Sequence, residues 1–156
     1  MNVRLSIIIA ARNEGENIGG LLKEIRRTLT ELEPSFEIIV VDGSSSDDTV
    51  DRARPHADRV ILQKSSGYGN AFKEGLEAAR GNYLLTMDGD LSHPPEVISL
   101  LYRRRSRAEM LIASRWIEGG SATMPAWRKF LSRCLNIAFS RLLFLPIRDL
   151  SSGFRL

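Results

Sequence analysis

Apolar residues in this chain fall into short continuous runs that alternate with stretches of helical spacing. The runs are rich in β-branched and aliphatic residues and predict buried strands at residues 3–10, 36–41, 60–62, 83–87 and 110–114. Apolar spacing of three and four predicts helices at 17–32 and 70–79, a short helix ending near Pro55, and one opened by Pro94 and Pro95. Strands that alternate with helices predict an α/β domain with a mostly parallel sheet flanked by helices.

Acidic residues follow two of the predicted strands. Asp42 comes directly after the second strand, and Asp88 and Asp90 come after the fourth. Open α/β sheets bind ligands at the carboxyl ends of their strands, and residues two apart on a strand point the same way. Two carboxylates there suit a divalent cation that holds a diphosphate. For Asp42 an ordinary Asx turn is the structural alternative, as is an Asp-Gly turn for the pair.

Other polar residues give weaker signals. Arg115 ends the fifth predicted strand, where a guanidinium could bind phosphate through two hydrogen bonds or form a surface ion pair. His93 precedes two prolines and is interpreted as a turn residue, since one histidine without partners is a poor metal signal. The segment 67–71 resembles a dinucleotide fingerprint, but Phe72 replaces its third small residue. A nicotinamide-binding protein is therefore disfavoured. Asp47 is the expected N-cap of the short helix.

Composition excludes several classes of protein. The chain has 156 residues, 43% hydrophobic and 26% charged, which indicates one globular domain rather than a disordered tail. The net charge of +3 comes without a recognition motif, so we expect no nucleic-acid partner. The single cysteine, Cys134, excludes an internal disulfide and fits a reducing, cytoplasmic compartment. We find neither a signal peptide nor an apolar stretch of transmembrane length.

The pattern changes after Arg115. Gly119 and Gly120 predict a mobile loop, and residues 130–145 combine a broad apolar face with a narrow polar stripe. This pattern is typical of an amphipathic helix lying on a bilayer, and equally of a core or subunit-interface helix in a homo-oligomer. We therefore expect a single domain over 1–156 whose character changes after residue 115, with a loop and helix at 116–148.

Several strings together resemble the family 2 glycosyltransferases of the GT-A fold. They are Ala11-Arg12-Asn13-Glu14 and residues 40–49, 87–96, 128–133 and 149–155. Within that family the chain is most similar to the dolichyl- and polyprenyl-phosphate glycosyltransferases related to dolichol-phosphate mannose synthase. The resemblance implies a GT-A, Rossmann-like sheet, with a donor-binding half at 1–115 and an incomplete, truncated C-terminus. It also implies a metal-dependent, inverting transfer of a sugar, with mannose from GDP-mannose favoured, to a polyprenyl or dolichyl phosphate.

The resemblance also implies roles for individual residues. Asp88 and Asp90 would bind Mg²⁺ or Mn²⁺, and with Arg115 they form the expected catalytic set. The expected nucleotide-sugar contacts are Ala10, Arg12, Glu14, Val41, Asp42, Asp88, Gly89, Asp90 and Arg115. The expected contacts to an acceptor phosphate are Arg128, Lys129 and Arg133. Peripheral contact with the cytoplasmic face of a membrane would run through 130–145.

The chain departs from the family pattern at four positions. Ala10 and Arg12 replace a frequent proline and tyrosine, Gly43 replaces a second aspartate, and Ser65 falls where a lysine is usual. Two alternatives follow: a truncated, non-catalytic sugar-nucleotide-binding module, and a family 2 transferase that uses a UDP-sugar and a different acceptor. A nucleotidyltransferase is disfavoured, because residues 13–16 lack the glycine- and lysine-rich loop that such enzymes carry early in the chain.

Overall fold

The computed structural model of the chain describes residues 3–31, 35–114 and 152–156, together with the single positions Trp127, Cys134, Leu135, Ile137 and Arg141. The chain divides into two compact units, Met1–Leu111 with Phe154–Leu156, and Ile112–Gly153. The first unit contains the strands and helices named below. In the second, the Ser152 hydroxyl donates a hydrogen bond to the Ala113 carbonyl oxygen at 3.0 Å.

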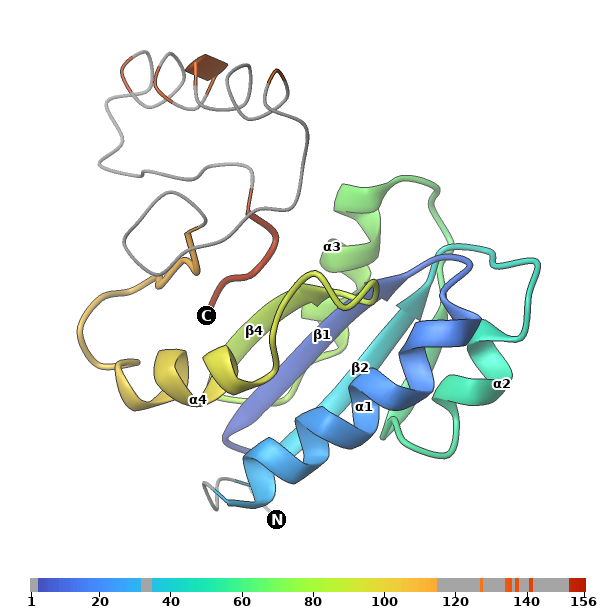
Figure 1. Cartoon of the computed structure of the whole chain (residues 1–156), viewed down its shortest axis with the longest axis horizontal. Helices are drawn as coiled ribbons and strands as arrows, with labels where there is room; N and C mark the ends of the chain where they lie inside the picture. The colour runs from blue at the N-terminus through green and yellow to red at the C-terminus, as the bar shows by residue number, and fades with distance from the viewer. Residues whose placement is uncertain are drawn as a thin grey trace. The chain divides into compact units, whose positions relative to one another are not determined.

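A four-stranded parallel sheet forms the centre of the first unit (Figure 1). Its strands are β1 (Leu5–Ala11), β2 (Phe36–Asp42), β3 (Arg59–Leu62) and β4 (Tyr83–Asp88), in the order β3-β2-β1-β4. The parallel α/β sheet predicted from the sequence is therefore confirmed. β1 lies between two strands and under helices on both faces, which explains why Ile7, Ile8 and Ile9 are fully buried in one continuous apolar run.

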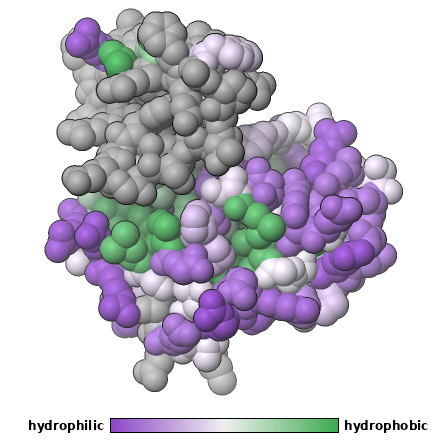
Figure 2. Space-filling view, viewed as in Figure 1, coloured by the Kyte–Doolittle hydropathy of each residue, from purple (hydrophilic) through white to green (hydrophobic). Residues whose placement is uncertain are grey.

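Helices cover both faces of this sheet (Figure 1). They are α1 (Gly15–Thr30), α2 (Thr49–Ala53), α3 (Tyr68–Ala78) and α4 (Glu96–Arg103). Of the four helices of this unit, α3 packs on one face, against β1 and β2, and the other three lie on the opposite face. The apolar residues of α1 recur with helical spacing and are buried, whereas Figure 2 shows mostly hydrophilic side chains over the outer surface of α1 and α2.

Two predicted helices begin earlier than expected. α1 starts at Gly15 rather than residue 17, and α3 starts at Tyr68 rather than residue 70. The α3 difference has a local cause, because Gly67 takes a φ of 111° and turns the chain sharply just before the helix. Tyr68, which lies before the helix predicted at 70–79, therefore stands on the first turn of α3.

The predicted fifth strand at 110–114 is wrong. In the described structure the outer edge of β4 pairs with the end of the chain, since Thr86 and Arg155 exchange two backbone hydrogen bonds of 2.8 and 3.1 Å. Leu111 exchanges two more with Leu156, at 2.7 and 2.9 Å. An antiparallel segment remote in sequence thus occupies the place beside β4 that a fifth parallel strand would need. The local apolar pattern around Ile112 carries no information about that competition.

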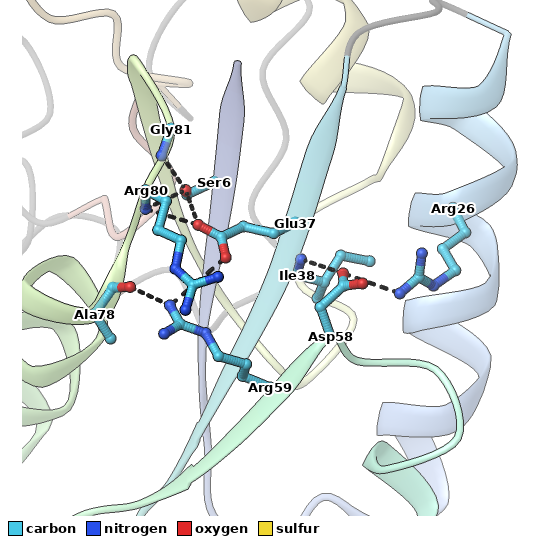
Figure 3. Close-up of polar contacts among 9 residues, drawn as sticks. All are labelled: Ser6, Arg26, Glu37, Ile38, Asp58, Arg59, Ala78, Arg80 and Gly81. Carbon is cyan, nitrogen blue, oxygen red and sulfur yellow. Dashed lines mark hydrogen bonds and ion pairs between the residues drawn. The ribbon is translucent and has the colours of Figure 1, made fainter. Parts of the chain in front are cut away.

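A buried carboxylate closes the amino ends of the strands (Figure 3). Glu37 of β2 is 5% exposed and accepts hydrogen bonds from the Ser6 hydroxyl at 2.6 Å and the Arg80 backbone N–H at 2.7 Å. The Arg59 guanidinium lies 3.6 Å from its other oxygen and also donates to the carbonyl of Ala78. Glu37 finds its partners within the fold, so this carboxylate serves the structure, although Arg59 Nε is buried without a hydrogen-bond partner among the described residues. The opposite, carboxyl edge differs.

Candidate functional site

Three strand ends meet at the carboxyl edge of the sheet. Ala11 is paired with Asp42 on one side, and Ala10 with Asp88 on the other. Backbone hydrogen bonds continue one residue further, from Gly43 N–H to the Ala11 carbonyl at 2.8 Å and from Gly89 N–H to the Ala10 carbonyl at 3.1 Å. Strand order reverses between β1 and β4, so this edge is the topological switch point at which open α/β sheets bind ligands.

A cavity of about 600 Å³ opens at this edge, within the usual size of a small-molecule site. Its walls come from the loops after β1, β2, β3 and β4. The lining residues are Ala10, Ala11, Arg12, Glu14, Gly43, Ser44, Gln63, Lys64, Ser66, Gly67, Tyr68, Ala71, Asp88, Gly89 and Asp90. Both carboxylates of the predicted metal pair therefore face the same cavity as the cations of Arg12 and Lys64, which suit an anionic ligand.

Asp88 is the most constrained acid in the cavity. Its side chain is 26% exposed, and its Oδ1 accepts a hydrogen bond of 2.5 Å from the Tyr68 hydroxyl. The backbone N–H of Asp88 donates to His93 Nδ1 at 3.2 Å, and His93 Nε2 lies 3.8 Å from Asp88 Oδ2. His93 thus braces the turn after β4, as the sequence predicted for a turn residue, and its ring stacks on Phe154.

Asp90 is held more loosely at the mouth of the cavity. It is exposed, and its Oδ1 accepts a hydrogen bond of 3.0 Å from the Ser92 backbone N–H. The next residue, Leu91, has a φ of 61°, a left-handed conformation that is rare for leucine and reverses the chain immediately after the second carboxylate. One acid therefore stands on a strand end and the other on a turn, with Gly89 between them.

The donor set fits a divalent cation. Hard cations such as Mg²⁺ accept one or two carboxylates and complete their coordination with substrate phosphates. Asp88 and Asp90 supply that pair, and the cavity they line has room for a diphosphate. Within the described part of the chain no cluster of three or more His, Cys, Asp or Glu side chains could hold a metal by itself. Two carboxylates alone match a cation whose remaining coordination comes from a bound ligand.

The structure places Asp42 differently from the acids of β4. Asp42 is 2% exposed and does not line the cavity. Its carboxylate accepts hydrogen bonds from the Ser45 N–H at 3.0 Å and the Ser45 hydroxyl at 2.5 Å, a local turn one residue longer than the Asx turn considered from the sequence. Val41 is fully buried in the core beneath the site. Direct contact of either residue with a nucleotide stays a prediction.

Side chains tie the loops after β1 and β2 to each other. The Asn13 N–H donates to the Ser45 hydroxyl at 2.9 Å, and Asn13 Oδ1 accepts from the Ser46 N–H at 2.9 Å. Asn13 has a φ of 56°, a conformation that asparagine tolerates better than most residues. The wall that carries Arg12 and Glu14 is thereby fastened to the wall that carries Gly43 and Ser44 before any ligand arrives.

Asp47 adds a second tie between the same loops. It is not the N-cap of α2, which is Asp48, so the predicted cap lies one residue too early. Its carboxylate accepts from the Gly15 N–H at 2.9 Å and from the hydroxyl and backbone N–H of Thr49. These hydrogen bonds, that from the Thr49 hydroxyl first, hold the pKa of Asp47 below its usual range. Asp47 links α1 to α2 more than it caps either helix.

Sequence reasoning missed the wall formed by the loop after β3. Gln63, Lys64, Ser66 and Tyr68 line the cavity, yet none was predicted as a site residue. The Gln63 amide donates to the Gly67 carbonyl at 2.7 Å and so shapes this loop. Tyr68 is 59% exposed, and partial burial of its phenol, followed by the hydrogen bond to the Asp88 carboxylate, raises the pKa of Tyr68 above its ordinary value. One feature of the sequence could have predicted this wall: residues 67–69 follow a strand of the same parallel sheet, so their loop lies at its carboxyl edge.

Four predicted site residues lie outside the described residues. They are Arg115, expected at the donor phosphates, and Arg128, Lys129 and Arg133, expected at the acceptor phosphate. The mobile loop expected after Arg115 and most of the helix expected at 130–145 also fall there. Among the residues that the structure does describe, no helix has the length and apolar character needed to cross a membrane.

The sheet, its switch-point cavity and the paired acids after β4 define an α/β protein of the nucleotide-sugar transferase type. The chain belongs to Glycosyl transferase family 2, whose profile matches residues 6–156. Its fold is the GT-A fold. Glucosyl-3-phosphoglycerate synthase from Mycobacterium tuberculosis, solved with UDP, superposes with a TM-score of 0.73 at 22% identity, covering 98% of this chain and 56% of that one. A crystal structure of that synthase that also holds Mn²⁺ superposes with a TM-score of 0.72 at 23% identity, and the match covers 98% of this chain and 56% of the synthase.

Curated relatives share more of the sequence. Dolichol-phosphate mannosyltransferase from Pyrococcus furiosus is 33% identical, covering 97% of this chain and 45% of that protein. Undecaprenyl-phosphate 4-deoxy-4-formamido-L-arabinose transferase from Pseudomonas aeruginosa is 32% identical, covering 88% of this chain and 42% of the relative. The chain therefore spans less than half the length of these two relatives.

Proposed function

We propose that the chain carries the donor site of a metal-dependent, inverting glycosyltransferase that moves a sugar from a nucleoside diphosphate to a polyprenyl phosphate. The observation that carries the proposal is the placement of Asp88 and Asp90 in one cavity at the switch point, in a chain of this family. The two curated relatives are named for transfer to dolichol phosphate and to undecaprenyl phosphate, which favours a polyprenyl phosphate acceptor. GDP-mannose is the favoured donor, by similarity to the first of them.

The residues of the cavity suggest how the donor would be held. Asp88 and Asp90 would bind a divalent cation, Mg²⁺ or Mn²⁺, which supplies positive charge to offset the charge of a leaving diphosphate. Arg12 and Lys64 line the same cavity and would add to its attraction for phosphates. The fastened loops after β1 and β2 keep the walls in place, which limits the entropy lost when a donor binds.

The chemistry needs no strong general base in this scheme. A phosphate oxygen of the acceptor is already anionic, so it can form a bond to the anomeric carbon from the side opposite the leaving group. The bond from that carbon to the diphosphate oxygen breaks, and its electron pair leaves with the nucleoside diphosphate. A single in-line displacement of this kind inverts the anomeric centre. The proposal also assigns two sets of basic residues. Arg115 would contact the donor phosphates, and the acceptor phosphate would be contacted by Arg128, Lys129 and Arg133.

Binding of nucleotide sugars tests the donor half directly. We expect GDP-mannose to bind more tightly with Mn²⁺ than without it, because a cation held by Asp88 and Asp90 would supply positive charge to the diphosphate. Titration calorimetry with GDP-mannose, UDP-glucose and UDP-galacturonate would separate the guanine and uracil donors. The matched control is the same titration with the free sugars. A chain that binds none of the nucleotides, with or without Mn²⁺, would contradict the proposal.

The proposal extends to peripheral contact with a membrane through residues 130–145, where a lipid-borne acceptor would be met. The apolar face and basic residues of that segment in the sequence support this extension. We expect the chain to float with liposomes that contain anionic lipid, and less so at high salt, because screening weakens the attraction of its basic residues. Absence of flotation at both low and high salt would count against it.

A further inference from the structure

The contact between Tyr68 and Asp88 joins two separate elements across the cavity. Tyr68 is the first residue of α3, and Asp88 is the last residue of β4. The phenol donates to one carboxylate oxygen at 2.5 Å, the short distance expected for a hydroxyl that donates to a charged acceptor. The contact therefore holds one oxygen of the more constrained acid at the site.

The phenol is placed by its own surroundings, independently of Asp88. The ring of Tyr68 packs edge-on against Phe72, with centroids 4.9 Å apart and planes at 89°. The loop that leads into α3 is fixed from within, because the Glu74 carboxylate accepts hydrogen bonds from the backbone N–H groups of Lys64 and Ser65 at 3.0 and 2.9 Å. A donor held in this way can set the orientation of the group that it meets.

Asp88 is braced by a second residue as well. Its backbone N–H is bound by His93, and the His93 ring lies stacked on Phe154, with centroids 4.9 Å apart and planes at 29°. Phe154 is 2% exposed, so this support is part of the core. With the backbone braced by His93 and one carboxylate oxygen held by Tyr68, little freedom is left to the torsions of the Asp88 side chain.

We propose that Tyr68 is a positioning residue, whose hydroxyl holds the Asp88 carboxylate in the orientation that receives a divalent cation together with a nucleoside diphosphate. The inference rests on the function proposed above. Carboxylates that ligate metals are themselves hydrogen-bonded, and loss of such a partner typically weakens metal binding by about 10–100-fold. This role adds a residue of α3 to the proposed metal site, where the sequence predicted no contribution to metal binding.

The Tyr68→Phe substitution tests this role, since it removes the hydroxyl and keeps the ring. Mn²⁺ would be titrated into the full chain by electron paramagnetic resonance, with saturating GDP and, separately, with saturating UDP. We expect the Mn²⁺ dissociation constant to rise roughly 10-fold. Nucleotide affinity without metal and the midpoint of thermal unfolding should not change, because the phenol contacts Asp88 and its ring packing is retained. Tyr83→Phe, at the far end of β4, is the matched control and should leave Mn²⁺ binding unchanged.

The outcomes separate this inference from the function on which it rests. If the wild-type chain fails to bind Mn²⁺ in the presence of GDP and also in the presence of UDP, the proposed function is overturned, and the role of Tyr68 with it. Wild-type binding with unchanged affinity in Tyr68→Phe would overturn the positioning role alone. Tighter Mn²⁺ binding in the variant would also overturn it, because the hydroxyl would then compete with the cation. An equal loss of metal-free nucleotide affinity would indicate general damage to the site and would overturn it too.

Discussion

Asp88→Asn should lower sugar transfer by roughly 10³-fold or more, because the proposed cation would lose one of its two carboxylate ligands. A bound metal of this kind stabilises the charge of a leaving diphosphate by several kcal/mol. Asparagine keeps the shape of the side chain and can still accept the hydrogen bond from Tyr68. The variant therefore removes charge with little change in packing. The measurements are the rate of transfer from GDP-mannose to a polyprenyl phosphate and the Mn²⁺-dependent gain in nucleotide affinity.

Asp51→Asn is the matched control for Asp88→Asn. It makes the same chemical change at an exposed position in the first turn of α2, away from the cavity. We expect wild-type binding and transfer from this variant. Circular dichroism would establish that both variants fold. A folded Asp88→Asn protein that kept its Mn²⁺-dependent nucleotide binding would show that the cation is held elsewhere.

Gly75→Ala should destabilise the fold by about 3 kcal/mol, because there is no room for even one methyl group between α3 and the sheet. A Cβ at Gly75 would lie 2.2 Å from Ile8 Cγ2 and 3.1 Å from Val41 Cγ2. Both neighbours are fully buried on the two central strands, so neither can move aside in a close-packed core. In a domain of this size that loss corresponds to a fall of roughly 6–12 °C in the midpoint of thermal unfolding.

Gly69→Ala gives the matched comparison within the same helix. Nothing lies within 4 Å of a Cβ built at Gly69, and alanine favours a helix over glycine by up to about 1 kcal/mol. We expect this variant to be as stable as wild type or slightly more so in thermal and urea unfolding. Equal effects from the two substitutions would mean that helix propensity, and not the close approach of α3, decides the outcome at Gly75.

Gly75→Ala should also weaken metal binding at the site. α3 carries Tyr68 at its first turn, so a helix pushed away from the sheet would move the phenol relative to Asp88 on β4. Stability and metal affinity are therefore linked through one helix. The linkage would appear as weaker Mn²⁺ binding in Gly75→Ala at temperatures where the variant is still folded.

Local sequence patterns were sufficient to predict strands and helices where burial of apolar side chains dominated. The continuous apolar runs of β1 and β2 predicted buried parallel strands, because a strand covered on both faces has no polar side to reveal. Helical spacing predicted α1 and α4 with small errors at their ends. The pair Asp88 and Asp90 could be assigned to a strand end, and the parallel arrangement then required that this end lie beside the end of β1.

Non-local competition defeated the same reasoning elsewhere. The run at 110–114 has the composition of a strand, yet the residues around Arg155 pair with β4. Asp42 has the position of a ligand-binding acid, yet its carboxylate is used by Ser45 in its own turn. The pairing beside β4 depends on which segment the tertiary structure brings to that edge, and the local pattern does not encode it. The turn at Asp42 is local, three residues long, and the sequence left it open beside ligand binding.

The amino-acid sequence by itself determined the parallel α/β class, the family motifs and the acids at the end of β4, because each depends on local periodicity or on a short string of residues. Only the tertiary structure decided that the loops after β1 and β2 are tied together through Asn13, that Gln63 and Lys64 face the cavity, and that the Tyr68 hydroxyl binds Asp88. The physical reason is that side chains 20 or more residues apart meet only after strand order and helix packing have brought their loops to one edge of the sheet.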